Sequence, residues 1–389
     1  MMNQQEQAIN DLLLATKYLE AEKYAKNILE KDSNNLGVLK LLSIALRSQE
    51  KVNESLAIMK TVSDMSSSLI DKELYIFELI SSANYQEALG VKSSYMKDPQ
   101  YRKMIKSLIE KQNVLFQKTH QFYLSYSLVK FKDNLQDLAD TIVNDEKILL
   151  RVKTFINNLF NRNAFRETSK AELHDPSFLG YAGLSENPFT DANELICLKN
   201  YSEFRDAIKL EVINILETEN TVPYVKDTGS LPQGLEHLKN NSDWSSLTVF
   251  AAGKLLVNKA DKLLSLLHDK FELADCKPMG PEVMISILKP GTYIGPHYGI
   301  SNIKQTLHIP IVLPEGDLAI KIGGIEKQWS NDYPLIFDDT FLHEAWNNTL
   351  EKRIVLIVDI WNPDLTTEEK IFLAKALPLI SEWKLTTRL

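Results

Sequence analysis

The chain has 389 residues, enough for two or three domains, and 44% of them are hydrophobic, which is ample for packed cores. Acidic residues outnumber basic residues by 52 to 44, giving a net charge of −8, and without a local basic patch this argues against a nucleic-acid partner. No apolar run is long enough to span a bilayer, and the polar start of the chain lacks the basic segment of a signal peptide. We therefore expect a cytoplasmic protein in which Cys197 and Cys276, far apart in sequence, are unpaired thiols.

Residues 1–115 combine apolar side chains at helical spacing with a repeated segment. Similar stretches begin at Ala21, Ser55 and Ala88, at intervals of 34 and 33 residues. This interval is typical of tetratricopeptide repeats, whose stacked helix pairs share a core and form a concave surface. The pattern predicts a short all-α repeat region. It either docks a peptide or protein partner or only supports the rest of the chain, and the sequence leaves both open.

Residues 116–174 continue the helical pattern and predict a linker or buttress. The composition changes near Glu172, where Pro, Gly and aromatic residues become frequent, which indicates a new domain over residues 175–389. Within it, Phe204–Thr218 and Leu255–Phe271 predict helices, and Tyr224–Leu238 is rich in loop-forming residues.

Short β-branched, apolar runs separated by turn signals dominate the C-terminal part of the chain. The turn signals include Pro290-Gly291. Strands are predicted at Ile285–Leu288, Leu307–Leu313, Leu335–Phe337 and Ile354–Ile360. Several short strands of this kind favour a β-sandwich or barrel, so the fold class is α+β, with helices first and a barrel second.

Three of the seven histidines, His297, His308 and His343, lie at the edges of these strands. Two imidazoles on neighbouring barrel rims can bind one metal ion, and non-heme Fe(II) oxygenases use two His and one carboxylate. The acid of that triad usually lies two residues after the first His, but here the position holds Gly299. Arg353, at the start of a predicted strand, can hold a dicarboxylate through a bidentate pair.

The same stretch resembles the aspartyl/asparaginyl β-hydroxylase family of Fe(II)- and 2-oxoglutarate-dependent dioxygenases. The matching segments are Ser286…Pro290-Gly291-Thr292, Pro296-His297-x-Gly299, Asn302, Leu307-His308, Phe337-Asp338-Asp339-x-Phe341-x-His343-Glu344-x-Trp346 and Arg353…Val358-Asp359-x-Trp361-x-Pro363-Asp364-Leu365-Thr366. The resemblance covers roughly residues 175–385. It implies a double-stranded β-helix, a jelly-roll or cupin-like barrel. Iron is held in this family by two His without a protein carboxylate.

The resemblance also implies a role for each matched residue. His297 and His343 would bind Fe(II), and Arg353 and Ser286 would hold the distal carboxylate of 2-oxoglutarate. Trp244, Thr306 and His308 would contribute to the co-substrate pocket, and Lys239 and Thr306 would face the substrate. With O2, the implied reaction hydroxylates an unactivated C–H, as in β-hydroxylation of Asp or Asn in a peptide or protein. Asp338 and Asp339 are also general-base candidates by residue type, but a role in forming a turn or in orienting a ligand is favoured.

The chain departs from the family pattern at two basic positions. Thr306 replaces an Arg two residues before His308, and Lys239 replaces a second Arg. Lys lacks the planar fork of Arg, so the recognition of an aspartyl side chain is in doubt. Lys304, on the same strand face as Thr306, is a candidate substitute for the missing charge.

Two other functions compete with the hydroxylase. One is a non-catalytic repeat protein with a decayed oxygenase barrel, which Thr306 favours and the set of His297, His343, Ser286 and Arg353 opposes. The other is a zinc hydrolase on a cupin-like barrel, which is weaker because catalytic zinc normally has three protein ligands.

Overall fold

The computed structural model describes residues 3–192, 200–226 and 234–387, apart from the side chain of Arg162. These residues form two compact units: one contains the residues up to Phe131 and those from Glu382 onward, and the other is Lys132–Ser381. Helix α8 (Val114–Ile142) runs across the boundary between the units, so the chain has no break at residue 115. No helix in the described part of the chain is both long and apolar enough to cross a membrane.

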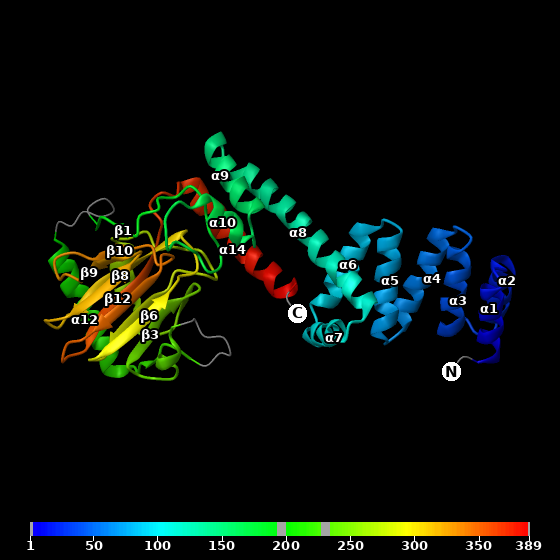
Figure 1. Ribbon diagram of the computed structural model, residues 1–389, viewed down its shortest axis with the longest axis horizontal. Helices are drawn as coiled ribbons and strands as arrows, with labels where there is room; N and C mark the ends of the chain where they lie inside the picture. Colours follow the sequence, from blue (N-terminus) through cyan, green and yellow to red (C-terminus); the bar gives the residue numbers. More distant parts are fainter. Residues whose placement is uncertain (1–2, 193–199, 227–233, 388–389) are drawn as a thin grey trace. The chain divides into compact units, whose positions relative to one another are not determined.

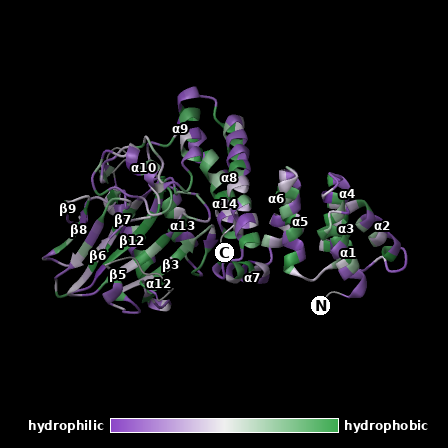
Figure 2. Cartoon of the chain, turned by 45° about the vertical axis from the view of Figure 1, so that its right-hand side comes forward, coloured by the Kyte–Doolittle hydropathy of each residue, from purple (hydrophilic) through white to green (hydrophobic). Residues whose placement is uncertain are grey.

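Helices build the first unit, and between residues 3 and 115 the described chain contains no strand (Figure 1). The helices are α1 (Gln4–Leu14), α2 (Tyr18–Leu29), α3 (Leu36–Arg47), α4 (Val52–Met65), α5 (Leu69–Ser81), α6 (Tyr85–Met96) and α7 (Pro99–Glu110). The repeated segments fall on α2, α4 and α6. Hydrophobic and hydrophilic residues alternate along each ribbon, as expected for helices that share cores with their neighbours (Figure 2).

Two antiparallel sheets form the centre of the second unit (Figure 1). The larger follows the order β1 (Phe189–Thr190), β10 (Leu335–Phe337), β7 (Lys304–Val312), β12 (Arg353–Trp361), β5 (Val283–Leu288), β3 (Trp244–Ala251), β2 (Val222–Pro223), with β4 (Lys254–Leu255) paired to β3. The smaller follows the order β6 (Thr292–His297), β11 (His343–Asn347), β8 (Leu318–Ile322), β9 (Ile325–Lys327). From β5 to β12 the chain crosses between the sheets repeatedly, which is the topology of a double-stranded β-helix.

All four predicted strands are present as β5, β7, β10 and β12. The helix predicted at Phe204–Thr218 is α12 (Tyr201–Thr218). The helix predicted at Leu255–Phe271 is wrong at its start, since α13 covers only Asp261–His268. Leu255 pairs in β4, and Lys259 has a positive φ of 73°, which a continuous α-helix does not allow. The other helices in the described ranges are α9 (Glu146–Asn157), α10 (Arg162–Thr168) and α14 (Thr367–Thr387), with a short 3-10 helix η1 (Glu236–Leu238).

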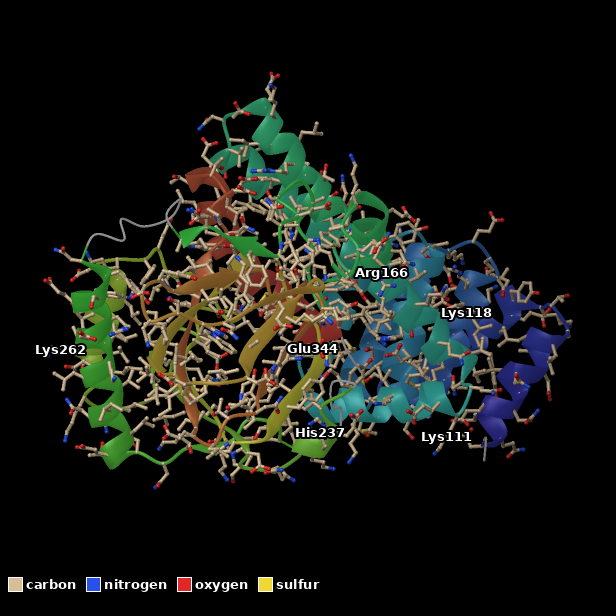
Figure 3. The ribbon with its side chains drawn as sticks, turned by 60° about the vertical axis from the view of Figure 1, so that its left-hand side comes forward. Lys111, Lys118, Arg166, His237, Lys262 and Glu344 are labelled. Carbon is tan, nitrogen blue, oxygen red and sulfur yellow. The ribbon has the colours of Figure 1, made fainter. Side chains whose placement is uncertain are left out.

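The two faces of the larger sheet have different partners. Side chains from α12 and α13 pack on its outer face, where they meet alternate residues of β12 such as Leu356 and Val358. Lys262 of α13 pairs with Glu211 of α12 at 2.7 Å on this side (Lys262 is labelled in Figure 3). The inner face packs against the smaller sheet through a second core that includes Val355. Because side chains alternate along a strand, residues 353, 357 and 359 of β12 point between the sheets.

Candidate active site

A cavity of about 290 Å³ opens between the two sheets. Strands β5, β7 and β12 supply one wall, and β6 and β11 supply the opposite wall. Seven of the residues predicted from the sequence line it: Trp244, Ser286, His297, Thr306, His308, His343 and Arg353. Lys239 does not belong to this lining; it is exposed at the end of η1, ahead of β3.

The two candidate metal ligands face each other across neighbouring strands. His297 and His343 are direct partners in the pairing of β6 with β11, and their ring centroids are 4.0 Å apart. Nδ1 of His297 donates to the Gly295 carbonyl at 2.8 Å, and Nδ1 of His343 donates to the Phe341 carbonyl at 2.9 Å. Because a carbonyl only accepts, each ring carries its proton on Nδ1 and keeps a free lone pair on Nε2.

Burial keeps both rings in this neutral form. Loss of solvent, and then the neighbouring His343, lower the pKa of His297 to about 3, and loss of solvent lowers the pKa of His343 as well. Neutral imidazole is the form that binds metal. Within the described ranges, no cluster of three or more His, Cys, Asp or Glu side chains is arranged to hold a metal. A metal ion at this pair would therefore have two protein ligands and open positions for other oxygens.

Arg353 is the most unusual charge in the cavity. Its side chain is only 2% exposed, and burial lowers the pKa of the guanidinium to about 9. Among the described residues it has no carboxylate partner, and its Nε–H has no acceptor. The guanidinium lies 5.2 Å from the centre of the Trp329 ring, which offers only a weak cation–π contact. A buried cation without a counter-charge costs several kcal/mol, and an anionic ligand would offset this cost.

Hydrogen-bond donors surround Arg353. The Trp244 indole donates to the Ser286 hydroxyl at 3.2 Å, which leaves the hydroxyl hydrogen of Ser286 available to another acceptor. The Trp329 indole donates to Nδ1 of His308 at 3.1 Å, so the proton of neutral His308 is on Nε2. Burial, and then the charge of Arg353, hold the pKa of His308 well below its usual range. The arrangement offers one full charge and two neutral donors to a carboxylate.

The opposite end of the cavity is rich in carboxylates. Lys304 lies at 2.5 Å from the Asp359 carboxylate, and both residues are buried. Burial opposes the Lys304 charge, but Asp359 and Asp339 raise its pKa above the usual range. The ammonium is thus matched within the protein and does not replace the family arginine as a free cation. Asp359 also accepts the Glu282 backbone N–H at 2.9 Å, which brings a further carboxylate to the same wall.

The Asp339 carboxylate lies against Gly299, two residues after His297. A Cβ added at Gly299 would lie 2.0 Å from Oδ1 of Asp339, and the Gly299 N–H donates to the Asp339 carbonyl at 2.7 Å. Burial, and then Asp338, opposed by Lys304, raise the pKa of Asp339 to about 6. Oδ1 of Asp339 has no hydrogen-bond partner among the described residues and almost no contact with solvent. Glycine at position 299 therefore makes room for a carboxylate that comes from another part of the chain.

This close approach predicts that Gly299→Ala destabilises the domain by about 1–3 kcal/mol, the usual cost of overpacking. The added methyl must displace the short, half-buried side chain of Asp339. In Asp339→Gly the space is empty, so Gly299→Ala should cost much less in that background. Urea denaturation of the parent, the two single variants and the double variant measures the coupling free energy between the two positions. Additive free energies of unfolding would show that the two side chains do not compete for one space.

The acid that follows His343 is not part of the cavity. Glu344 points to the other face of β11, where it accepts from the Tyr293 hydroxyl and pairs with Lys321 at 3.3 Å (Glu344 is labelled in Figure 3). Conversely, sequence reasoning missed Trp329, which contacts both His308 and Arg353. Trp329 lies in an irregular segment after β9 where no periodicity marks it, so no sequence pattern could have found it.

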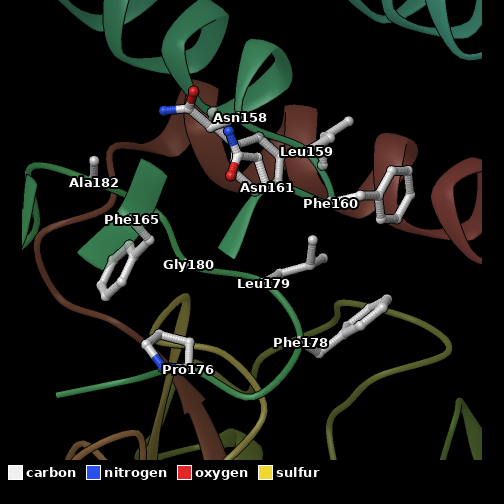
Figure 4. Close-up of a pocket in the computed structure, with 11 residues that line it drawn as sticks. Asn158, Leu159, Phe160, Asn161, Phe165, Pro176, Phe178, Leu179, Gly180 and Ala182 are labelled. Carbon is white, nitrogen blue, oxygen red and sulfur yellow. The ribbon is translucent and has the colours of Figure 1, made fainter. Parts of the chain in front are cut away.

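A second hollow lies near α10 and is lined by aromatic and small residues (Figure 4). Its volume of about 20 Å³ is the space of a single water molecule. It is too small for an organic substrate. Cys276 is a buried free thiol, as expected, whereas Cys197 lies outside the described residues.

Comparison with known proteins gives a family for the segment that holds the cavity. Residues 205–363 match the family model described as aspartyl/asparaginyl beta-hydroxylase. The human aspartyl/asparaginyl beta-hydroxylase is 33% identical over 148 residues, which are 37% of this chain and 19% of that protein. The mouse aspartate beta-hydroxylase domain-containing protein 2 is 37% identical over 149 residues, 36% of this chain and 43% of that protein.

A third relative carries a different name. The ornithine lipid ester-linked acyl 2-hydroxylase of Rhizobium tropici is 26% identical over 187 residues, 48% of this chain and 64% of that protein. In each case the match covers less than two thirds of the relative. The matched segment contains both histidines of the facing pair, Arg353 and the double-stranded β-helix around them. Residues 205–363 of this chain are therefore similar to the aspartyl/asparaginyl β-hydroxylase family.

Proposed function

We propose that the protein is an Fe(II)- and 2-oxoglutarate-dependent hydroxylase that acts on a C–H bond of an amino-acid-type substrate, free or within a peptide or protein. One observation carries the proposal: Arg353, a fully buried guanidinium without a counter-charge among the described residues, lies in the cavity of the facing His297–His343 pair. 2-Oxoglutarate supplies what each part lacks, a distal carboxylate for Arg353 and oxygen ligands for a metal with two protein donors. The residues present therefore fit both groups.

Each residue has one task in this proposal. His297 and His343 hold the metal through Nε2, because the carbonyls of Gly295 and Phe341 keep the protons on Nδ1. Arg353 and the Ser286 hydroxyl bind the distal carboxylate, and Trp244 orients that hydroxyl. When bound, iron and 2-oxoglutarate supply the oxidising chemistry: O2 is reduced, 2-oxoglutarate becomes succinate and CO2, and one oxygen atom enters the substrate.

The apolar part of the lining has a separate task. It excludes water from the reacting carbon and so protects the oxidant from side reactions. The residues that do this come from both sheets: Met284, Ile294, Ile320, Phe337, Ala345 and Ile357.

The names of the relatives include hydroxylases of aspartyl or asparaginyl residues and of a lipid acyl chain. For this chain we propose an amino-acid-type substrate, and the helical repeats of the first unit are a candidate docking surface for it. Thr306 is neutral and Lys304 is paired with Asp359, so once 2-oxoglutarate is bound at Arg353 the described lining residues offer no further free cation for an aspartyl side chain.

The test is the release of succinate from 2-oxoglutarate by the purified full chain. We expect release that requires Fe(II) and O2, stops after removal of the metal by a chelator, and returns on addition of Fe(II). A non-catalytic scaffold with a decayed barrel would bind no 2-oxoglutarate. Titration of 2-oxoglutarate into the Mn(II)-loaded protein without O2 separates the two cases. No binding in that titration rules out the enzyme.

A further inference from the structure

A backbone segment that does not line the cavity, residues 169–181, is bonded to the loop that carries His343. The Leu342 N–H donates to the Leu173 carbonyl at 2.7 Å. Because a trans peptide group is planar, with its N–H and C=O in opposite directions, this bond also fixes the Phe341 carbonyl, which belongs to the same peptide. That carbonyl accepts Nδ1–H of His343 at 2.9 Å. Leu173 thus sets the direction of the carbonyl that determines the His343 tautomer.

His174 lies at the centre of this contact and is only 5% exposed. It pairs with Phe341 in an isolated antiparallel bridge, and the two rings stack in parallel with their centroids 4.2 Å apart. Nε2 of His174 is 3.0 Å from Oγ1 of Thr340, whose hydroxyl hydrogen goes to the Asp338 carboxylate. Nε2 of His174 is therefore the donor to Thr340, and Nδ1 accepts the Ser169 hydroxyl at 3.3 Å.

The same segment also holds the loop that follows His297. The Ser177 N–H donates to the Gly299 carbonyl at 2.9 Å. Further along, the Tyr181 N–H donates to the side-chain carbonyl of Asn302 at 2.8 Å, and the Asn302 amide donates back to the Tyr181 carbonyl at 2.9 Å. Residues 169–181 therefore connect the two loops whose histidines form the facing pair, although they lie before residues 205–363, which match the family model.

We propose that His174 is a positioning residue for the metal site. Its Nε2–H bond to Thr340 holds the turn in which the Phe341 carbonyl fixes Nδ1–H of His343. The inference rests on the proposed function and extends the metal site to a segment that does not line the cavity. A group that orients a metal ligand typically contributes about 10–100-fold to metal affinity. A histidine that only filled the core would change stability and leave the His343 tautomer as it is.

The first measurement is the tautomer of His343, read by nitrogen NMR of the metal-free full chain with isotope-labelled histidine. The signal is assigned by its loss in His343→Ala. We expect only Nδ1–H in the parent and a mixture of Nδ1–H and Nε2–H in His174→Ala. His174→Gln should restore the single tautomer, because its amide N–H can donate to Thr340 in place of the imidazole.

The second measurement is the affinity of the same proteins for Mn(II). We expect His174→Ala to weaken binding by at least about 10-fold, and His174→Gln to recover most of this loss. Leu267→Ala is the matched control for lost stability, because Leu267 is fully buried on α13 in the core outside the larger sheet and does not line the cavity. It should lower the stability of the same unit and leave the tautomer and the affinity unchanged.

The outcomes separate the two proposals. If the parent binds no Mn(II), the proposed function is refuted, and the tautomer in the metal-free protein alone decides the role of His174. A single Nδ1–H tautomer in His174→Ala overturns that role, as does parental Mn(II) affinity of this variant when the parent binds the metal. The role is also overturned if Leu267→Ala shows the same changes, or if His174→Gln behaves like His174→Ala.

Thr340→Val provides the same test if His174→Ala does not fold. It keeps the volume of the side chain and removes the hydroxyl that accepts from His174. We expect the mixture of His343 tautomers and the weaker Mn(II) binding in this variant too. A parental tautomer in Thr340→Val contradicts the proposed route from His174 to His343.

Discussion

His297→Ala or His343→Ala is expected to abolish iron binding and succinate release. The structure offers the metal two protein ligands, and within its described part no third His, Cys, Asp or Glu is placed to compensate. Loss of a group that only supports a ligand typically costs about 10–100-fold in metal affinity, so loss of a ligand itself should cost more than about 100-fold. The iron content after dialysis against Fe(II) under argon measures the effect.

The matched control is His237→Ala. This imidazole is exposed, stacks on Tyr293 and lies outside the cavity lining, so its loss removes a histidine without touching the facing pair (His237 is labelled in Figure 3). We expect the control to retain parental iron content. Retention of iron in both His297→Ala and His343→Ala would show that the metal binds elsewhere and would refute the proposed metal site.

The second large effect concerns Arg353. Arg353→Met should weaken the binding of 2-oxoglutarate by roughly 2–5 kcal/mol, the cost of removing one partner of a buried charge pair. A change of 1.4 kcal/mol corresponds to about 10-fold in affinity, so the loss is easily seen by titration of the Mn(II)-loaded protein. Ser286→Ala should lose only about 1 kcal/mol, because it removes one hydroxyl.

The same substitution should have the opposite effect on the stability of the free protein. Arg353 is buried without a counter-charge in the described structure, and burial alone lowers its pKa. Replacement of a buried charge by an apolar side chain of similar size is often neutral or stabilising by about 1–4 kcal/mol. We therefore expect Arg353→Met to be at least as stable as the parent in urea denaturation. A large loss of stability together with parental affinity would make Arg353 a structural residue.

The strands of the barrel could be predicted from the sequence because their pattern is local. In Ile354–Ile360, alternate residues pack against the outer helices or point between the sheets, and this alternation follows from the two-residue period of a strand. The helix that was expected to begin at Leu255 is wrong at its start, because pairing with β3 and the positive φ of Lys259 override the apolar spacing. Local periodicity cannot report such long-range pairing.

The sequence by itself predicted the barrel strands, the repeated helices and the histidines and arginine that line one cavity, and the resemblance to a family added the double-stranded β-helix. Only the tertiary structure decided how the charges there are matched. Lys304 is paired with Asp359 on the neighbouring strand, Trp329 reaches His308 from an irregular segment, and Asp339 fills the space beside Gly299. These contacts join residues from separate strands and loops, so they depend on strand register and loop path, which a spacing pattern along the chain does not contain.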